Sequence, residues 1–505
     1  WELKRTLLPL DLLSFVLERD TSRVVPGARV KQAAGARGVQ FLSPDASLSF
    51  AASQLLVNCD LFPKEFSIVV TVKVNRFSPR KKETKRDEKH AGIILGLKLS
   101  QNSLPCSELL RGQLWFNPLK KGLYVCDGSA WITVLEDHKR LDYVLEQQVL
   151  ATSSETHDVE VFQIQDIGLM AAMAHRSSAS GSAVYLWTNL GFRLYQNIST
   201  NGALSWKHFQ IGKKAYLVVS NSGTETNKSV DKQPESDFSV IYKWSKRRKR
   251  FVRFQTLQTY CARDWEAFDI NEQTYLAVAN HRMGNNNHTI NSVIYKWNRS
   301  TKSFEVHQTL ITSGAYDWEF FKVGPYHFLV VANAFDGVTT SLDSVIYVWI
   351  DGKFQVFQTI KTFCATDWEM FQIGSRVFLV VANGHRLQGN GPSQYTINST
   401  IYELDMSGRM FVRFQDIVTY SAVDWEFFSL GEEYFLVVAN SYNGESYSLN
   451  SILYRWQGYE GFVPVHWLPT IGCSDWEFFS SNGESFLIYS SAKAPLSKVF
   501  KLKTY

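Results

Sequence analysis

Residues 315–333 read AYDWEFFKVGPYHFLVVAN, two runs of β-favouring residues separated by a short turn with Gly324 and Pro325. The second run is apolar throughout, as in a strand covered on both faces. The Asp-Trp-Glu element of the first run occurs five times, with spacings of 53, 50, 57 and 51 residues. Two weaker copies precede them, DVEVF at 158–162 and SWKHF at 205–209. Residues 143–505 therefore hold seven copies of one supersecondary unit.

Each repeat has two further β-like runs. The third reads SVIYKW at 239–244 and SVIYVW at 344–349, and the fourth reads FVRFQTLQT at 251–259 and FQVFQTIKT at 354–362. Four short runs joined by turns predict a four-stranded antiparallel meander. One meander cannot cover both faces of its apolar second strand, whereas meanders stacked radially do. We therefore predict an all-β chain built mainly of one seven-bladed β-propeller.

The order of strand types predicts how the ring closes. The repeats open with a fourth-type strand at 143–152 and end with a third-type strand at 497–502. The first strand can therefore complete the last blade. We expect the Asp-Trp-Glu strands to be innermost. The long polar loops between second and third strands then share one face with the fourth-to-first turns. We predict that this face is the interaction surface, because a rigid scaffold commonly carries its binding loops on one side.

The Asp-Trp-Glu element has two interpretations. An Asp and a Glu two residues apart on a strand face the same side, and paired carboxylates can serve acid–base catalysis. A catalytic site is asymmetric, however, and this pair recurs. We therefore predict a scaffold in which the Asp accepts backbone hydrogen bonds at a turn, the Trp packs between blades, and the Glu contacts a neighbouring strand or a basic group. A ring of carboxylates near the axis could also hold a cation such as calcium. The scaffold residues are Asp264, Trp265, Glu266, Asp317, Trp318, Glu319, Asp367, Trp368, Glu369, Asp424, Trp425, Glu426, Asp475, Trp476 and Glu477.

Composition and charge indicate an ordinary globular protein, with 45% hydrophobic residues, 20% charged residues and a net charge of +5. No apolar run is long enough to predict a membrane span, and the first residues show no signal segment. The basic run at 246–250, KRRKR, fits a heparin-like polyanion, a cleavage site for secretory-pathway proteases, or an exposed hairpin turn. Nothing indicates nucleic-acid binding, and no zinc, phosphate-loop or nucleophile-elbow motif occurs.

The six cysteines fall into three groups. Cys106 and Cys126 bracket a short segment and could form a disulfide across a hairpin. Cys261, Cys364 and Cys473 lie at one small-residue turn of three separate repeats, so we expect buried free thiols. Cys59 has no evident partner.

Five Asn-x-Ser/Thr sequons are candidate glycosylation sites. Three of them fall in predicted loops or hairpin turns, where a glycan is tolerated, and Asn197 falls in a predicted strand, where it is least favourable. The candidates are Asn197, Asn227, Asn287, Asn298 and Asn398.

The repeat, with FLVVAN, DWEFF and SVIYKW, resembles the EAR, or EPTP, repeat, seven of which form the propeller of the leucine-rich glioma-inactivated proteins. Upstream, residues 38–74 and 91–100 resemble the first half of a thrombospondin-type laminin G domain. The resemblance divides the chain into a partial laminin G-like β-sandwich (1–105), a Cys-bracketed connecting segment (106–142) and the propeller (143–505). An intact laminin G domain needs about twice the strands found there, so we expect a truncated form with an unpaired sheet edge.

The resemblance implies a secreted protein that acts at the cell surface or in the matrix of neural, sensory or epithelial tissue. In the glioma-inactivated relatives the propeller docks a receptor ectodomain, and the family has no catalytic residues to carry over. We therefore expect a non-enzymatic protein that binds an extracellular or cell-surface protein and modulates signalling or adhesion. Two alternatives stay open. One is a hydrolase with a site on the propeller axis, and the other is an intracellular scaffold.

Overall fold

The computed structural model describes residues 28–33, 36–41, 97–99, 105–117, 122–135, 140–223, 235–387 and 391–504. The chain separates into two compact units, Trp1–Asp137 and His138–Tyr505. Within the described residues, no helix is long and apolar enough to cross a membrane.

The first unit contains two small sheets. Strands β1 (Ala28–Ala33) and β2 (Ala36–Phe41) form an antiparallel hairpin. The second sheet has the order β3-β4-β5-β6, formed by Leu97–Leu99, Leu114–Asn117, Gly122–Cys126 and Trp131–Leu135, with a 3-10 turn η3 at Glu108–Leu110. Of the two segments that resemble laminin G, only 38–41 and 97–99 are described, and Cys59 lies outside the described residues.

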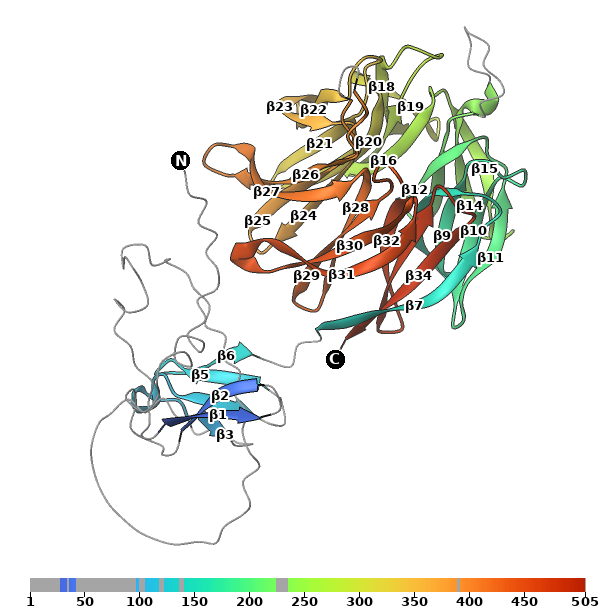
Figure 1. Cartoon of the computed structure of the whole chain (residues 1–505). Coiled ribbons are helices and arrows are strands. Elements are labelled where there is room, and N and C mark those ends of the chain that lie inside the picture. The colour runs from blue at the N-terminus through green and yellow to red at the C-terminus, as the bar shows by residue number, and fades with distance from the viewer. Residues whose placement is uncertain are drawn as a thin grey trace. The chain divides into compact units, whose positions relative to one another are not determined.

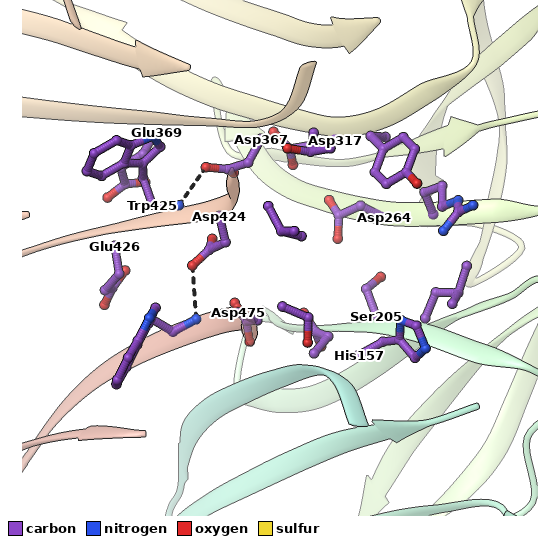
Figure 2. A pocket seen from close by; sticks show the side chains of 18 of the residues that line it. His157, Ser205, Asp264, Asp317, Asp367, Glu369, Asp424, Trp425, Glu426 and Asp475 are labelled. Atoms are coloured by element: carbon purple, nitrogen blue, oxygen red, sulfur yellow. Dashed lines mark hydrogen bonds between the residues drawn. The ribbon is translucent and has the colours of Figure 1, made fainter. Parts of the chain in front are cut away.

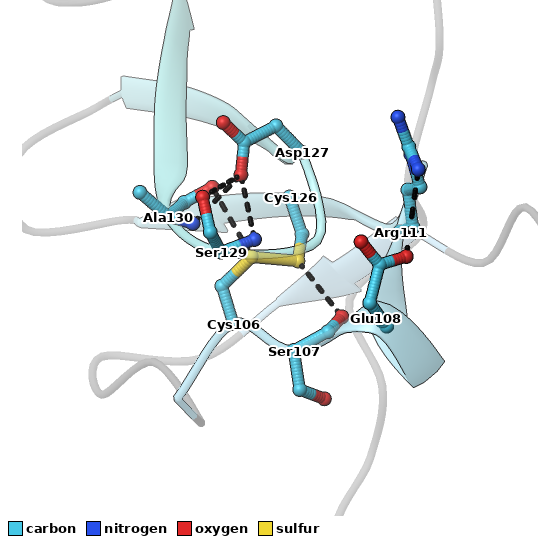
Figure 3. The surroundings of a disulfide bond; sticks show 8 residues. All are labelled: Cys106, Ser107, Glu108, Arg111, Cys126, Asp127, Ser129 and Ala130. Carbon is cyan, nitrogen blue, oxygen red and sulfur yellow. Dashed lines mark hydrogen bonds and ion pairs between the residues drawn. A yellow bond between two sulfur atoms is a disulfide. The ribbon is translucent and has the colours of Figure 1, made fainter.

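A disulfide joins Cys106 to Cys126, with 5.5 Å between the Cα atoms (Figure 3). It ties the segment before η3 to the end of β5, a central strand of the sheet. Beside it, Asp127 Oδ1 accepts hydrogen bonds from the backbone N–H groups of Ser129 and Ala130. These bonds lower the pKa of the exposed Asp127 carboxyl.

The second unit confirms the predicted seven-bladed propeller. It consists of seven four-stranded antiparallel sheets, which we number as blades in chain order (Figure 1). Blade 1 is β8 (Thr156–Ile164), β9 (Gly168–His175), β10 (Ser182–Thr188) and β11 (Gly191–Ile198); blade 2 is β12 (Ala203–Ile211), β13 (Lys214–Asn221), β14 (Ser239–Ser245) and β15 (Arg250–Leu257); blade 3 is β16 (Ala262–Ile270), β17 (Gln273–Asn280), β18 (Thr289–Asn298) and β19 (Ser303–Ser313); blade 4 is β20 (Ala315–Val323), β21 (Tyr326–Asn333), β22 (Ser341–Ile350) and β23 (Lys353–Phe363). Blade 5 is β24 (Ala365–Ile373), β25 (Arg376–Asn383), β26 (Thr396–Asp405) and β27 (Met410–Tyr420); blade 6 is β28 (Ala422–Leu430), β29 (Glu433–Asn440), β30 (Ser448–Trp456) and β31 (Phe462–Ile471); blade 7 is β32 (Cys473–Ser481), β33 (Glu484–Ser491), β34 (Leu496–Thr504) and β7 (Leu141–Ala151). Short 3-10 turns, η4 (Glu235–Asp237) and η5 (Gly458–Glu460), lie in the loops.

The ring closes through blade 7, whose outermost strand comes from the other end of the chain. Strand β7 pairs antiparallel with β34, for example Leu150 with Ser497 and Leu145 with Lys501. In Figure 1 the teal β7 lies beside the red β34. The strand starts two residues earlier than the sequence predicted, at Leu141.

The hydrophobic core lies between blades. Each of its seven clusters combines residues of two neighbouring blades, so Trp265 of blade 3 packs in one cluster with Val218 and Ile241 of blade 2. The second strands are the most buried, because a blade covers each of their faces. In β21, Leu329, Val330 and Val331 have no exposed surface.

Outer strands of neighbouring blades are joined by glutamine side chains. Gln196 of β11 accepts a hydrogen bond from the N–H of Phe251 and donates one to its C=O, each at 2.9 Å. Both backbone groups of a buried residue are thereby satisfied. The same pair of bonds joins Gln148 to Phe192, Gln255 to Phe304, Gln308 to Phe354, Gln358 to Phe411 and Gln415 to Phe462. Between blades 6 and 7 the corresponding position holds His466.

Candidate functional site

The first strands of the blades line an axial channel with a cavity of about 230 Å³ (Figure 2). A register shift near the start of each of these strands, as between Ala315 and Trp318, places two successive residues on the channel side. The lining therefore has three layers. The layers are His157, Leu204, Arg263, Tyr316, Thr366, Val423 and Ser474; then Asp158, Ser205, Asp264, Asp317, Asp367, Asp424 and Asp475; then Glu160, Lys207, Glu319, Glu369, Glu426 and Glu477. Glu266 is the equivalent residue of the third layer in blade 3, where it pairs with Lys207.

The aspartates of the second layer tie neighbouring blades together. Asp367 Oδ2 accepts a hydrogen bond from the backbone N–H of Trp425 in the next blade at 2.9 Å, and Asp424 does the same for Trp476. Asp158, Asp317 and Asp475 make equivalent bonds. The prediction that the Asp accepts backbone hydrogen bonds is confirmed. The prediction that it does so at a turn is wrong, because the N–H donors lie across the interface in the next blade.

The glutamates and tryptophans of the repeat also act across interfaces. Glu369 Oε1 accepts from the N–H of Phe427 at 3.2 Å, and Glu426 from Phe478 at 2.8 Å. The six tryptophans of the inner strands are buried between blades, and Trp318 Nε1 donates to the C=O of Val278 in the preceding blade. Much of the repeated carboxylate chemistry is therefore used to assemble the ring.

Blade 2 breaks this pattern. Ser205-Trp206-Lys207 replaces Asp-Trp-Glu, so one layer of six glutamates contains one ammonium group. Lys207 Nζ lies 2.8 Å from Glu266 Oε2. Burial alone would lower the pKa of Lys207, but Glu266, Glu160 and Asp264 outweigh it and hold that pKa well above its usual value. Lys207 is therefore charged and partly neutralises the acidic lining.

Burial raises the pKa values of the six aspartates and of five of the glutamates, and neighbouring like charges raise most of them further; the five are Glu160, Glu319, Glu369, Glu426 and Glu477. The pKa is raised to about 7 for Glu160 and to about 6 for Asp264, where Lys207 opposes the shift. It is raised to about 7 for Asp424 and about 8 for Glu426. The channel thus takes up protons as the pH falls through the neutral range.

Oxygen-rich walls are the chemistry that calcium prefers. Nevertheless, in the part of the chain that the structure describes, no three His, Cys, Asp or Glu side chains are grouped as metal ligands. One oxygen of most channel carboxylates already accepts a backbone N–H, and Lys207 supplies a fixed positive charge. A calcium ion in the channel would have to bind the second oxygens of these carboxylates, and it stays a prediction.

The long loops form the second candidate site, on the predicted face. In blades 2 to 6 the base of the loop is held by the asparagine that ends the second strand. Asn440 Oδ1 accepts from the N–H of Tyr420, and its Nδ2 donates to the C=O of Asn450. Asn280, Asn333 and Asn383 make the same pair of bonds. The loops are therefore presented from a fixed base while their sequences differ.

A row of aromatic side chains crosses the loops of blades 5 to 7. Tyr395 lies 4.8 Å from Tyr442 between ring centroids, and Tyr442 stacks on Tyr447 at 4.5 Å. His385 adjoins Tyr395 at 5.6 Å, and Lys493 Nζ lies 4.5 Å from the Tyr447 ring centre. We call these five residues the tyrosine row. All are at least partly exposed, and neighbouring repeats do not share them.

The channel mouth on the same face is basic. Burial and the charges of Arg176, Arg263 and Lys493 lower the pKa of His157 to about 3. Arg263 also lies over the Tyr316 ring, 4.4 Å from its centre. Tyrosines beside cations are typical of protein interfaces. Sequence reasoning predicted the face but missed the row, because its members are scattered over three loops.

The remaining predicted sites are distributed around the surface. Asn287, Asn197 and Asn398 are exposed, the last two within strands β11 and β26, while Asn298 ends β18 and caps a turn. Asn227 lies outside the described residues. Cys261, Cys364 and Cys473 are free thiols. Cys261 is half-buried, which differs from the prediction of a buried thiol. Cys473 also lies one position later, at the start of β32, because Gly472 occupies the turn.

Comparison with known proteins identifies the repeat. The EPTP domain model matches residues 191–245, 250–298, 303–350, 353–405, 410–457 and 461–502. Each match begins in the fourth strand of one blade and ends in the third strand of the next. The sequence repeat is therefore offset from the blade by one strand. Because of this offset the last blade lacks a fourth strand of its own, and β7 supplies it.

Two relatives match most or all of the chain. The human thrombospondin-type laminin G domain and EAR repeat-containing protein is 41% identical over 659 aligned positions, which cover 100% of this chain and 97% of the relative. The mouse protein of the same name is 55% identical over 404 residues, or 79% of this chain and 59% of the relative. The human alignment is 154 positions longer than the 505-residue chain, so the relative has segments without a counterpart here. The chain belongs to the family of thrombospondin-type laminin G domain and EAR repeat-containing proteins.

Proposed function

We propose that this protein is a secreted, non-enzymatic recognition protein that binds a cell-surface or matrix protein through the loop face of its propeller. The tyrosine row carries the proposal. It joins three blades across the face where the loops differ from repeat to repeat, and tyrosine provides a large contact area at small entropic cost. The basic channel mouth beside it favours a partner with acidic groups near its apolar contacts.

The extracellular location is supported by the Cys106–Cys126 disulfide, since such bonds persist in oxidising compartments. The name of the relatives, with its thrombospondin-type laminin G domain, agrees with that location. Modulation of signalling or adhesion would follow from occupying a receptor or matrix protein at the cell surface.

The test is saturable binding of the purified full-length protein to intact cells, with and without prior trypsin treatment of the cells. The variant Tyr442→Ser/Tyr447→Ser removes the stacked pair. Its matched control is Tyr326→Ser/Tyr459→Ser, which removes two exposed tyrosines, 60% and 89% accessible, from turns at the opposite face. We expect trypsin and the loop-face variant to reduce binding at least about tenfold, the scale of an interface hot spot, and the control to bind as the wild type.

Equal loss in both variants would refute the loop face as the binding site. Binding that survives trypsin would refute a protein partner. The axial hydrolase makes a different prediction: turnover of a substrate that is abolished by Asp367→Asn, with cell binding unchanged. The intracellular scaffold predicts that protein from secreting cells carries reduced cysteines and unmodified sequons.

A further inference from the structure

The face opposite the loops carries the short turns between first and second strands and between third and fourth strands. On blade 2 both of these turns are strongly basic. All their lysines and arginines are exposed, and no acidic residue occurs within 211–214 or 245–250. We call this set the basic hairpin surface: Lys213, Lys214, Lys246, Arg247, Arg248, Lys249 and Arg250.

The pairing of the strands places the two turns side by side. Tyr216 of β13 lies opposite Lys243 of β14. Lys214 and Ser245 each lie two residues beyond that pair. The two turns therefore begin at the same height along the strands, at the same end of the sheet. The centres of the two turns are separated by two strand spacings, about 10 Å. Sequence reasoning found the run at 246–250 but not the adjoining lysines.

The fold itself does not require these charges. The corresponding turn of blade 3 is closed by Asn298, whose Oδ1 accepts from the N–H of Ser300, and that of blade 5 by Asp405, which accepts from Ser407. In blade 2, Ser245 Oγ accepts from the N–H of Arg248. The hairpin needs one polar capping residue, and the five consecutive cations are additional to it.

The basic turn is held rigidly against blade 1. The hydroxyl of Tyr195 donates to the C=O of Lys249 at 2.6 Å, and Gln196 bonds both backbone groups of Phe251. Phe251 is 2% exposed. A protease needs its substrate extended in the active site, which this paired hairpin resists. The same rigidity lowers the entropic cost of binding a ligand.

Among the residues that the structure describes, none of the seven cations forms an ion pair, whereas Lys207, Lys361 and Lys498 do. A compact, uncompensated cluster of lysine and arginine binds polyanions, and arginine presents a planar fork that pairs with two oxygens of one anionic group.

We propose that the basic hairpin surface binds heparan sulfate, a sulfated polysaccharide of the cell surface and matrix. The proposal relies on the extracellular location proposed above but concerns a second ligand on the other face. Sulfate groups along one chain would contact both turns of blade 2, while the loop face stays free for a protein. The two ligands together would hold the protein at a cell surface while it engages its partner.

The test measures equilibrium binding of the purified full-length protein to immobilised heparan sulfate over a series of salt concentrations. The test variant is Lys246→Ser/Arg247→Ser/Arg248→Ser. The control, Lys302→Asn/Lys353→Ser/Arg409→Asn, removes the same charge from the corresponding turns of blades 3, 4 and 5. We expect at least about fivefold weaker binding and a shallower salt dependence for the first variant only. The separate variant Lys213→Ser/Lys214→Ser weakens binding through the other turn, and thermal unfolding verifies that each variant folds.

An equal loss in the test and control variants would overturn the proposal, because net charge would then be responsible. Equal binding to chemically desulfated heparan sulfate would overturn it too, as would binding to phosphatidylserine vesicles without binding to heparan sulfate. Failure of the protein-binding proposal would look different. It would leave this direct interaction intact, and the Tyr442→Ser/Tyr447→Ser variant would then bind cells as the wild type does.

Discussion

Replacing Lys207 by Met tests how the acidic channel is held together. Lys207 Nζ lies 2.8 Å from Glu266 Oε2, and the two side chains are 34% and 8% exposed. Removing one partner of a buried ion pair costs about 3–5 kcal/mol, because the other charge stays behind without compensation. Since Lys207 retains some contact with channel water, we expect the Lys207→Met variant to lose about 2–4 kcal/mol of unfolding free energy at pH 7.5.

The loss should depend on pH in a defined direction. The pKa values of Glu160 and Asp264 are raised to about 7 and about 6, and Lys207 opposes both shifts. Without Lys207 these pKa values rise further. At pH 7.5 the variant must then bind protons at these carboxyls in order to fold, which costs free energy because the same carboxyls are ionised in the unfolded chain. At pH 5 those protons are already bound in the folded wild-type protein. The cost of Lys207→Met is therefore smaller at pH 5 than at pH 7.5.

Urea unfolding followed by tryptophan fluorescence measures this cost, since the tryptophans of the inner strands are buried. The matched control is Lys361→Met, which breaks an exposed ion pair with Asp343 at 3.6 Å and should cost less than about 1 kcal/mol. The double variant Lys207→Met/Glu266→Gln should recover at least half of the loss. The reasoning is refuted if the two single variants cost the same, or if the cost of Lys207→Met does not change with pH.

Three further outcomes are expected. Deleting residues 141–151 should lower the melting temperature by more than about 10 °C, because blade 7 loses its outer strand; an unchanged value in calorimetry would mean that the ring closes differently. Gln308→Ala should cost about 1–3 kcal/mol in urea unfolding by leaving the N–H and C=O of the buried Phe354 without partners, whereas His466→Ala, where no such pair of bonds exists, should cost less. The wild-type propeller should become more stable as pH falls from 8 towards 7, because its channel carboxylates have pKa values above those of the unfolded chain while the histidines of the unfolded chain are still mostly neutral; stability that rises with pH in this range would contradict the raised values.

The propeller could be predicted almost completely from the sequence, because its information is repeated. The spacing of Asp-Trp-Glu gave the blades, and the order of strand types gave the closing strand. The details of the site could be predicted less well. Whether Asp367 bonds its own turn or Trp425 of the next blade depends on how blades stack, and one strand read alone does not contain that information. The tyrosine row and the lysines beside KRRKR likewise become neighbours only when strands distant in sequence are paired.

Repetition also separates residues that assemble the ring from residues that give this protein its specificity. Some features occur at nearly every interface, such as the two bonds from a glutamine side chain to a phenylalanine backbone or the bond from Asp to the Trp N–H. They have to be explained by what all interfaces share. Positions that break the repeat need an individual reason. Lys207 has one in the charge balance of the channel, and His466 lies next to blade 7, where β7 pairs with β34 and closes the ring. The basic turns of blade 2 and the tyrosine row of blades 5 to 7 have no such structural reason. They occupy opposite faces, so the two proposed ligands, a polyanion and a protein, would not compete with each other.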